Sequence, residues 1–317
     1  MIDIKTLAEK LASEESIALF CHVRPDGDTI GSAVALKLAL EKKGIKATVF
    51  CEDIIPERFF FQSGVSDIKK EFFGEYSAFV AIDSADVTRL GSFAEIFAKH
   101  KNTYCIDHHI SNPRYAKYNY VVDNSSNAEN IFDIITLLNV EICKNISNLL
   151  AMGIITDTGN FKHKNVTEKT FLTMARLVVA GADCNKIVNY MFTMQTKARA
   201  KLFGITMSSI RYFYNNRFAV ATITKSNLQD TGAKEDETEG FIDFVMGIKG
   251  VEVGACVMEI EQNKYKVSLR SHNANVNNVA SAFGGGGHIL ASGCRICGEY
   301  EEVIDKLSFA VSRELID

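Results

Sequence analysis

Four short segments of the sequence place acids and imidazoles next to apolar runs. These segments are His22–Asp28, Asp83–Asp86, Asp107–His109 and Asp157–Gly159. Carboxylate and imidazole ligands with no thiolate favour Mn²⁺, Mg²⁺ or Fe²⁺ over a structural zinc ion. Two such ions, about 3.5–4 Å apart, can clamp the attacking and leaving oxygens in phosphoryl transfer. The segments therefore predict a two-metal hydrolase that acts on phosphate esters.

The residues of these segments are expected to play different roles. Asp83 follows an apolar run and is a natural bridging ligand, and His108 and Asp157 would complete the second ion. An isolated acid after a strand is more often a turn or helix cap, which is how we interpret Asp86 and Asp123. Asp107 is expected to accept a hydrogen bond from an imidazole and fix its tautomer. His163 is a further candidate because it lies near Asp157 in the sequence.

Apolar runs alternate with helical patterns in the first part of the chain, which predicts a parallel sheet. Strands are expected at Ser16–Cys21, Lys46–Cys51, Ala78–Ile82 and Thr103–Ile106. Helices are expected at 3–13, Thr29–Lys43, Ser92–Lys99, 128–139, 142–155 and Glu168–Ala180. Three of the four acidic segments directly follow strands. Ligands in open α/β sheets bind beyond the carboxyl ends of the strands, so these segments can meet in space.

The last third of the chain predicts a second, smaller α/β domain. Strands are expected at Arg217–Thr224, Val251–Glu261, Tyr265–Arg270 and Cys294–Cys297, and helices at Val276–Phe283 and Glu299–Glu314. Gln195–Phe213 contains little Gly or Pro and predicts one long helix. The expected division is a catalytic domain over 1–190, a helical linker over 191–213 and a substrate-binding domain over 214–317.

A glycine-rich stretch, Gly284–His288, lies between apolar runs in the second domain. Four positions without side chains allow backbone N–H groups to approach an anion closely, as in phosphate-binding nests. His288 adds a donor, and Arg270 ends an apolar strand, where its guanidinium could hold a phosphate through two hydrogen bonds. We therefore expect an anion-binding loop rather than a surface linker.

The composition excludes several other classes of protein. The chain has 317 residues, of which 47% are hydrophobic and 23% charged, and a net charge of -4, so a long nucleic-acid duplex is not the expected partner. The first residues do not form a signal peptide, and no apolar window approaches the length of a membrane span. The eight cysteines are mostly scattered through apolar runs, which suits a reducing cytoplasm. Cys294 and Cys297 form one C-x-x-C pair, which is weak evidence for zinc, and any role of the pair stays open.

The four acidic segments, in this order, resemble the DHH phosphoesterase superfamily. Ser268–Ser271 and Gly284–His288, followed by Ala291-Ser292-Gly293, resemble its DHHA1 domain. The match covers nearly the whole chain, and its layout is similar to the branch of oligoribonucleases and pAp phosphatases. The resemblance implies an α/β catalytic domain, with a parallel sheet and helices on both faces, joined by a helical linker to a smaller α/β domain.

The resemblance also implies site residues and two Mn²⁺ ions, with Mg²⁺ or other divalent ions as alternatives. One ion would be held by His22, Asp26 and Asp83, and the other by Asp28, Asp83, His108 and Asp157. Catalysis would rest on Asp83 and on His109, which would face the scissile phosphate. The residues implied to hold the substrate are Arg270, Ser271, Gly285, Gly286, Gly287 and His288. Arg114 and Ser125–Glu129 lie where the family lines its cleft. Asn160 departs from the aromatic residue of many relatives.

The implied activity is metal-assisted hydrolysis of very short oligoribonucleotides, removal of the 3′-phosphate of pAp, or both. An activated water would attack phosphorus in line, with no protein nucleophile. The alternative is a phosphodiesterase for cyclic di-AMP or pApA with the same two-metal chemistry. A pyrophosphatase and a nucleotide-binding regulator without turnover are rival interpretations. The expected partner is short single-stranded RNA or a nucleotide, with no membrane, and a homodimer stays open.

Overall fold

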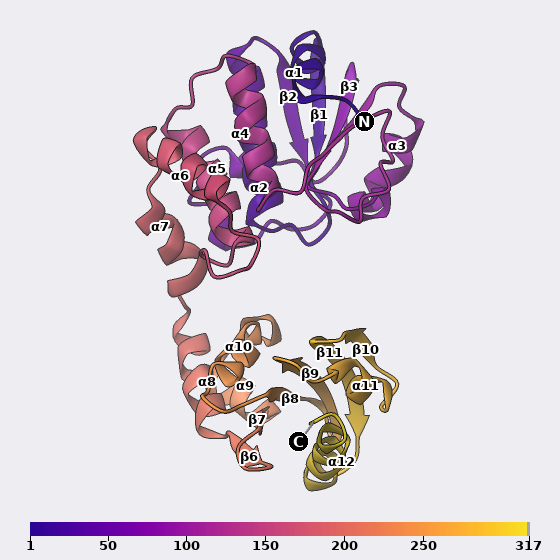
Figure 1. The fold of residues 1–317 in the computed structure, drawn as a ribbon, viewed down its shortest axis with the longest axis vertical. Coiled ribbons are helices and arrows are strands. Elements are labelled where there is room, and N and C mark those ends of the chain that lie inside the picture. The colour runs from indigo at the N-terminus through magenta and orange to yellow at the C-terminus, as the bar shows by residue number, and fades with distance from the viewer. Residues whose placement is uncertain (316–317) are drawn as a thin grey trace. The chain divides into compact units, whose positions relative to one another are not determined.

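The computed structural model describes residues 1–315, and its chain divides into two compact units (Figure 1). Unit 1 spans Met1–Met194 and unit 2 spans Gln195–Asp317. Each unit has its own sheet and its own hydrophobic core. The fold is therefore α/β in both units, with a parallel sheet in the first and a mixed sheet in the second.

The sheet of unit 1 has five parallel strands in the order β2-β1-β3-β4-β5. Their bounds are β1 Ser16–Phe20, β2 Lys46–Phe50, β3 Ala78–Ile82, β4 Thr103–Asp107 and β5 Tyr118–Val121. The sequence predicted the first four strands and missed β5, a short edge strand that pairs only with β4. Because all five strands are parallel, their carboxyl ends lie along one edge of the sheet.

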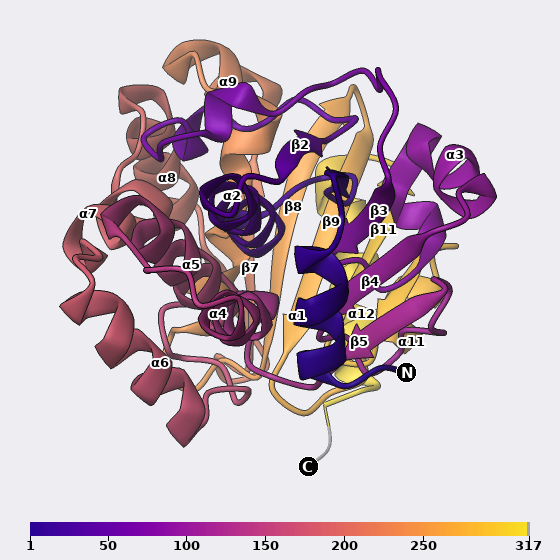
Figure 2. The same cartoon turned by 90° about the horizontal axis from the view of Figure 1, so that it is seen from above.

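Helices cover both faces of this sheet. Alternate residues of β1 point to opposite sides, since Ile17 and Leu19 pack in one core cluster and Ala18 and Phe20 in another. Figure 2 shows α2, α4 and α5 together on one side of β3 and β4, with α3 on the other. The bounds are α1 Ile4–Ala12, α2 Gly27–Lys42, α3 Ala94–Lys99, α4 Asn127–Leu137, α5 Lys144–Asp157, α6 Glu168–Val179 and α7 Cys184–Val188. Short 3-10 turns lie at Glu57–Phe59 and Val65–Asp67, a longer 3-10 segment with a kink at Gly91 spans Val87–Phe93, and a π-helical turn spans Asn189–Thr193.

Helices α2 and α5 approach each other closely because glycines line their contact. A Cβ at Gly31 would lie 2.3 Å from the Leu149 carbonyl oxygen. A Cβ at Gly27 would lie 2.4 Å from Thr156 Oγ1, and one at Gly153 would lie 2.7 Å from Asp28 Oδ1. Only residues without a side chain fit such separations. The contact brings the start of α2 against the end of α5, and so brings two of the acidic segments together.

Unit 2 is built on a six-stranded sheet in the order β10-β11-β9-β8-β7-β6. The pairings are antiparallel except for the parallel pair of β7 and β8. The strands are β6 Arg211–Phe213, β7 Phe218–Ile223, β8 Val253–Glu261, β9 Lys264–Ser271, β10 Gly286–His288 and β11 Ala291–Cys297. The helices are α8 Lys197–Ser208, α9 Lys225–Thr231, α10 Phe241–Met246, α11 Val276–Ser281 and α12 Tyr300–Ser312, with a single turn at Glu235–Thr238.

Two expectations for this part of the chain are wrong. The helix expected over Gln195–Phe213 ends at Ser208, and Arg211–Phe213 forms β6 because these residues pair with Phe218–Val220 of β7. Gly284–His288 is not an open loop, since Gly286–His288 forms β10 against β11. In unit 1, the helix expected from Ser92 begins at Ala94, after a 3-10 turn. Within residues 1–315, none of the helices combines the length and the apolar character that a membrane crossing requires.

Candidate metal centre

Two groups of ligand-type side chains lie at the carboxyl edge of the sheet in unit 1. The first group is His22, Asp26 and Asp83, and the second is Asp28, His108 and Asp157. A third group contains Asp83, His108 and His109, so Asp83 and His108 connect the set. The structure thus brings together all six residues that the sequence singled out as metal ligands. Their roles as ligands stay a prediction.

In the first group, His22 is oriented by the backbone. Its Nδ1 lies 2.9 Å from the Val23 carbonyl oxygen, while its Nε2 lies 3.6 Å from both Asp26 Oδ2 and Asp83 Oδ2. A hydrogen bond from Nδ1 to the carbonyl leaves Nε2 without a proton and free to bind a metal. Two oxygen or nitrogen ligands of one ion, each about 2.1 Å from it, lie roughly 3–4 Å apart. The separations in this group suit a shared divalent ion.

The second group repeats this arrangement around His108. Its Nδ1 lies 3.1 Å from the Asn124 carbonyl oxygen. Its Nε2 faces three carboxylate oxygens, at 3.4 Å from Asp83 Oδ1, 3.7 Å from Asp157 Oδ2 and 4.0 Å from Asp28 Oδ2. Most of these distances are too long for hydrogen bonds and suit ligands that share an ion. Asp83 presents one oxygen to each histidine, which is the geometry of a bridging carboxylate.

Asp83 also provides an internal test of whether a cation fits. Its side chain is 2% exposed, and Oδ1 is buried without a hydrogen-bond partner within residues 1–315. Its backbone has φ 56°, which a non-glycine residue adopts at a cost and which recurs at functional sites. The Asp83 N–H donates to the Ile106 carbonyl at 2.9 Å and holds this conformation in place. A bound cation would satisfy the buried oxygen, so the residues present fit a metal.

The helix starts position the two acids of the first loop. Asp26 is the N-cap of α2, and its Oδ1 accepts from Asp28 N at 3.0 Å and Thr29 N at 3.1 Å, while Oδ2 faces His22. Asp28 is buried, and its carboxylate accepts from the backbone of Asn127 at 2.6 Å and Ala128 at 2.9 Å. These donors form the first turn of α4, whose dipole favours a negative charge there. The acids are therefore held before any ion binds.

The protonation states show how unbalanced the cluster is without a cation. Burial alone would lower the histidine pKa values, but the facing carboxylates raise the pKa of His22 to about 10 and that of His108 to about 11. Burial raises the pKa of Asp28 and brings the pKa of Asp157 to about 6. Burial also opposes ionisation of Asp83, yet the two imidazoles hold its pKa below the usual range. Divalent cations would balance this cluster and displace the protons that its histidines and acids otherwise hold more tightly.

His109 is oriented differently from His108. Its Nδ1 lies 2.8 Å from Asp107 Oδ1, which leaves Nε2 as the free nitrogen of the ring. This hydrogen bond raises the pKa of His109, against the effect of partial burial. Asp107 is fully buried, and its Oδ2 accepts from Asn112 Nδ2 at 2.6 Å, while the same amide donates to the Ser84 carbonyl at 3.0 Å. Asp107 thus orients an imidazole, as expected from the sequence, and Asn112 in turn fixes Asp107.

Two residues near the cluster escaped the sequence reasoning. Arg89 Nη2 lies 3.0 Å from His22 Nδ1, and its carbonyl accepts from Val23 N at 2.7 Å. It follows Asp86 in a short turn, and no sequence signal marks it. Asn112 could have been noticed, since it follows Asp107 by five residues and amides commonly hold buried carboxylates.

Other candidates lie outside the three groups. His163 is exposed and its Nδ1 lies 3.1 Å from the Asp157 carbonyl oxygen, so it contacts the backbone rather than the carboxylate. Arg114 is exposed and its N–H donates to Asn112 Oδ1 at 2.7 Å. Ser125–Glu129 forms the start of α4 and is buried. Asn160 lies in the turn after α5, with φ 57°.

In unit 2 the predicted substrate residues separate into two sets. Arg270 and His288 lie in one cross-strand row with Ala291, so their side chains leave the same face of the sheet. Ser271 is the next residue along β9 and points to the opposite face, where it is buried and its hydroxyl donates to the Ala274 carbonyl. The structure therefore does not bring Ser271 together with Arg270 and His288.

The glycines of this segment serve a close approach of strands. Gly284, Gly285 and Gly287 donate their N–H groups to Ser281 O, Ala280 O and Asn277 Oδ1. A Cβ at Gly285 would lie 2.3 Å from the Gly293 carbonyl oxygen, and one at Gly287 2.6 Å from that of Ala291. The sequence predicted a nest of free N–H groups here. Because these three N–H groups are already bonded, they do not form such a nest. Anion binding at this segment stays a prediction that depends mainly on the His288 side chain.

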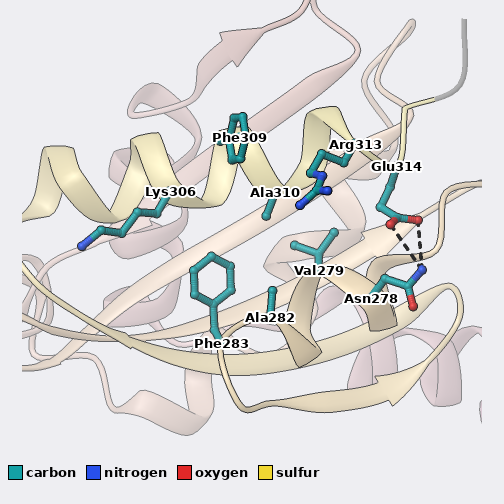
Figure 3. Close-up of a pocket in the computed structure, with 9 residues that line it drawn as sticks. All are labelled: Asn278, Val279, Ala282, Phe283, Lys306, Phe309, Ala310, Arg313 and Glu314. Carbon is teal, nitrogen blue, oxygen red and sulfur yellow. Dashed lines mark hydrogen bonds between the residues drawn. The ribbon is translucent and has the colours of Figure 1, made fainter.

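A separate hollow of unit 2 contains none of the predicted site residues. Its volume is about 640 Å³. Figure 3 shows its lining residues on and around α11 and α12, with Phe283 and Phe309 among them. It lies on the face of the sheet that α11 and α12 cover. The hollow offers apolar surface but no cluster of metal-ligand side chains.

Comparison with known proteins agrees with the geometry. Residues 16–154 match the DHH family, N-terminal domain, and residues 215–316 match the DHHA1 domain. A Thermus thermophilus protein, named bifunctional oligoribonuclease and PAP phosphatase NrnA, is 30% identical over 98% of this chain and 94% of its own. The Bacillus subtilis protein of the same name is 25% identical over 92% of each chain. The crystal structure of an exopolyphosphatase-related protein from Bacteroides fragilis has a TM-score of 0.86 at 24% identity, covering 98% of this chain and 95% of its own, and at that identity it supports the fold alone.

Proposed function

This chain belongs to the DHH family and carries a DHHA1 domain, and we propose that it hydrolyses very short oligoribonucleotides, pAp, or both, with two Mn²⁺ ions. It is a hydrolytic enzyme that acts on phosphate ester bonds. The finer choice of substrate is supported by the relatives from Thermus thermophilus and Bacillus subtilis, which are named as oligoribonuclease and PAP phosphatase. The free state of all eight cysteines supports a reducing, cytoplasmic location.

The observation that carries the proposal is the placement of Asp83. Its buried carboxylate lies between His22 Nε2 and His108 Nε2, and one of its oxygens has no hydrogen-bond partner within residues 1–315. A buried charge between two imidazoles, with further acids behind each, is costly unless cations are present. We propose that His22, Asp26 and Asp83 hold one ion, and that Asp28, Asp83, His108 and Asp157 hold the other.

The two ions, when bound, supply a water of lowered pKa and positive charge for the phosphoryl oxygens. This water would give one proton to solvent, and its oxygen would form a bond to phosphorus as the ester P–O bond breaks. The leaving oxygen would keep the electron pair of that bond and take up a proton from solvent. His109 donates from Nε2 to a non-bridging oxygen, where negative charge develops. Asp107 keeps the ring oriented for this donation, and its hydrogen bond raises the pKa of His109. No side chain forms a covalent bond to the substrate.

Unit 2 is proposed to recognise the substrate, with residues 1–190 as the catalytic part and 214–317 as the recognition part. Arg270 and His288, which share one face of the sheet, would hold a phosphate distant from the scissile bond. Ser271 is assigned a structural role instead, because its hydroxyl is already bonded to the Ala274 carbonyl.

The test uses purified full-length protein with Mn²⁺ and a panel of end-labelled dinucleotide, pAp, pApA and cyclic di-AMP. We expect turnover of the dinucleotide or of pAp, and at least a thousandfold loss in Asp83→Asn, which keeps the shape of the side chain but removes its charge. Asp123→Asn, on an exposed loop, is the matched control and should keep full activity. Unchanged turnover in Asp83→Asn would refute the metal assignment. A strong preference for cyclic di-AMP or pApA would replace the proposed substrates while keeping the chemistry.

A further inference from the structure

One face of the sheet in unit 2 exposes basic side chains along β9 and β11. Residues opposite each other in an antiparallel pair point to the same face, so the register defines rows of side chains. Arg270 pairs with Ala291, Ser268 with Gly293, and Lys266 with Arg295. Tyr265, Val267 and Leu269 alternate with these residues and pack against α11 and α12. The row residues therefore face away from that core.

Lys266 and Arg295 form a like-charge pair across the two strands. Both are exposed, and each is the directly opposite partner of the other. Like charges directly opposite each other destabilise a sheet. Neither has an ion-pair partner in the part of the chain that the structure describes. Lys264 lies two residues before Lys266 on the same face of β9, and it pairs with Glu261 at 3.1 Å. An anion between Lys266 and Arg295 would remove the repulsion.

Small residues separate this pair from Arg270. The intervening row contains Ser268, Gly293 and Gly286. Because these residues have small side chains or none, the surface is recessed between Arg270 and the Lys266–Arg295 pair. Lys266, Ser268 and Arg270 line one side of a hollow of about 340 Å³. The four residue steps from Lys266 to Arg270 span about 13 Å of strand, and both side chains are long enough to lean into this space.

The remaining walls of the hollow limit where an anion can lie. Cys256 and Met258 of β8 contribute apolar surface beside the row. Glu235, Asp236 and Glu239 line the far side and would repel a phosphate. A phosphate is therefore expected over β9, where Lys266 lines the hollow and Arg295 lies opposite it on the neighbouring strand, while the apolar side chains of β8 can accept a sugar or a base.

We propose that Lys266 and Arg295 form a second phosphate subsite, which holds a further phosphate of a single-stranded oligoribonucleotide whose first recognised phosphate lies at Arg270 and His288. The inference rests on the proposed function and extends it to the length of the substrate. Substrates of three or more nucleotides reach both subsites, whereas pAp, with a single nucleoside, reaches only one. The subsite favours oligoribonucleotides over pAp.

Binding is tested with the full chain and a fluorescein-labelled pentaribonucleotide in EDTA, which blocks hydrolysis, by anisotropy from 50 to 300 mM salt. For single-stranded nucleic acid, the slope of log K against log salt decreases in magnitude by about 0.7 for each phosphate contact removed. Because the two residues share one phosphate, Lys266→Gln with Arg295→Gln should lower the slope by about 0.7 and raise the Kd about tenfold or more. Lys264→Gln, on the same strand and face but already paired with Glu261, is the matched control and should change neither value.

A second measurement compares substrates in Mn²⁺. The double variant should raise KM for a pentaribonucleotide severalfold and leave KM for pAp unchanged. An unchanged salt slope overturns the subsite, and so does an equal loss for pAp and the pentaribonucleotide, because that result reports only general electrostatic attraction. If the wild-type chain binds with the expected slope but cleaves nothing with Mn²⁺, the proposed function fails while the subsite stands.

Discussion

The carboxylate of Asp107 holds the imidazole of His109 by a 2.8 Å hydrogen bond between Oδ1 and Nδ1. The bond fixes which nitrogen is free and favours the protonated ring. Asn112 holds the other oxygen of the same carboxylate at 2.6 Å. Asn112 thus holds Asp107, and Asp107 holds His109. Of these three residues, only His109 can reach a substrate.

Replacing Asp107 by Asn should separate orientation from metal binding. The hydrogen bond raises the pKa of His109, so its loss moves that pKa down toward the ordinary value near 6.5. We expect kcat to fall about 10- to 100-fold, and the pH above which activity declines to move lower. The pH profile of kcat measures this shift. A profile that only drops in height, with its alkaline limb unmoved, would show that His109 does not act as a protonated donor.

Replacing His22 by Asn should remove one of two ions. His22 belongs to the first ligand group only, whereas His108 belongs to the group with Asp28 and Asp157. The stoichiometry of bound Mn²⁺, measured by calorimetry or elemental analysis, should fall from two to one per chain. Replacement of His163, whose ring Nδ1 contacts the Asp157 backbone carbonyl rather than the carboxylate, should leave the stoichiometry at two. A value of two in the His22 variant contradicts the assignment.

Metal binding should stabilise the protein more as the pH rises. The metal-free folded state raises the pKa of His22 to about 10, of His108 to about 11 and of Asp157 to about 6. All three groups bind protons more tightly in the folded than in the unfolded chain, so their contribution to stability is lost as the pH rises. Metal ions displace these protons, and the apparent affinity should rise up to tenfold per pH unit for each proton displaced.

This pH dependence is measured from the Tm in Mn²⁺ and in EDTA between pH 6 and 8.5. The difference between the two Tm values should grow steadily over the range. In Asp83→Asn the difference should be small at every pH, which controls for metal bound elsewhere. A constant difference in the wild-type chain would mean that the histidines do not lose protons on metal binding.

Introducing a methyl group at Gly31 should push α2 away from α5. The added Cβ would meet the Leu149 carbonyl oxygen at 2.3 Å, and a backbone atom cannot move aside easily. Gly31→Ala should lower the free energy of unfolding by about 1–3 kcal/mol, measured in urea, and should weaken Mn²⁺ binding as well. Gly204→Ala, in α8 with open space around the position, is the control and should stabilise by about 0.5–1 kcal/mol. Equal effects of both substitutions would contradict the close contact.

The proximity of the predicted metal ligands could be foreseen because parallel strands end at a common edge. Asp83 and His108 follow adjacent strands β3 and β4, so their proximity follows from the strand order once the sheet is parallel. Arg89 could not be found in this way, since its position depends on how one turn packs against another. In unit 2, the glycines, His288 and Arg270 predicted an anion-binding segment, and the resemblance implied that it holds the substrate. The structure does not test that role.

The second unit was predicted less well, for reasons of tertiary pairing. Nothing local ends the helix at Ser208, because the strand Arg211–Phe213 exists only by pairing with β7. The glycines of 284–287 were interpreted as freedom for backbone N–H groups, but they allow β10 to pack closely on β11. A glycine run by itself does not distinguish these two uses.

Asp26 divides its carboxylate between two tasks, with one oxygen bonded to the amides of Asp28 and Thr29 and the other facing His22. An ion that binds the oxygen facing His22 therefore also affects the first turn of α2, because the same carboxylate caps that turn. Binding of a cation is therefore expected to slow hydrogen exchange at the backbone amides of Asp28 and Thr29. Exchange at the first turn of α2 would then report how much of the metal site is occupied, even in a sample without substrate.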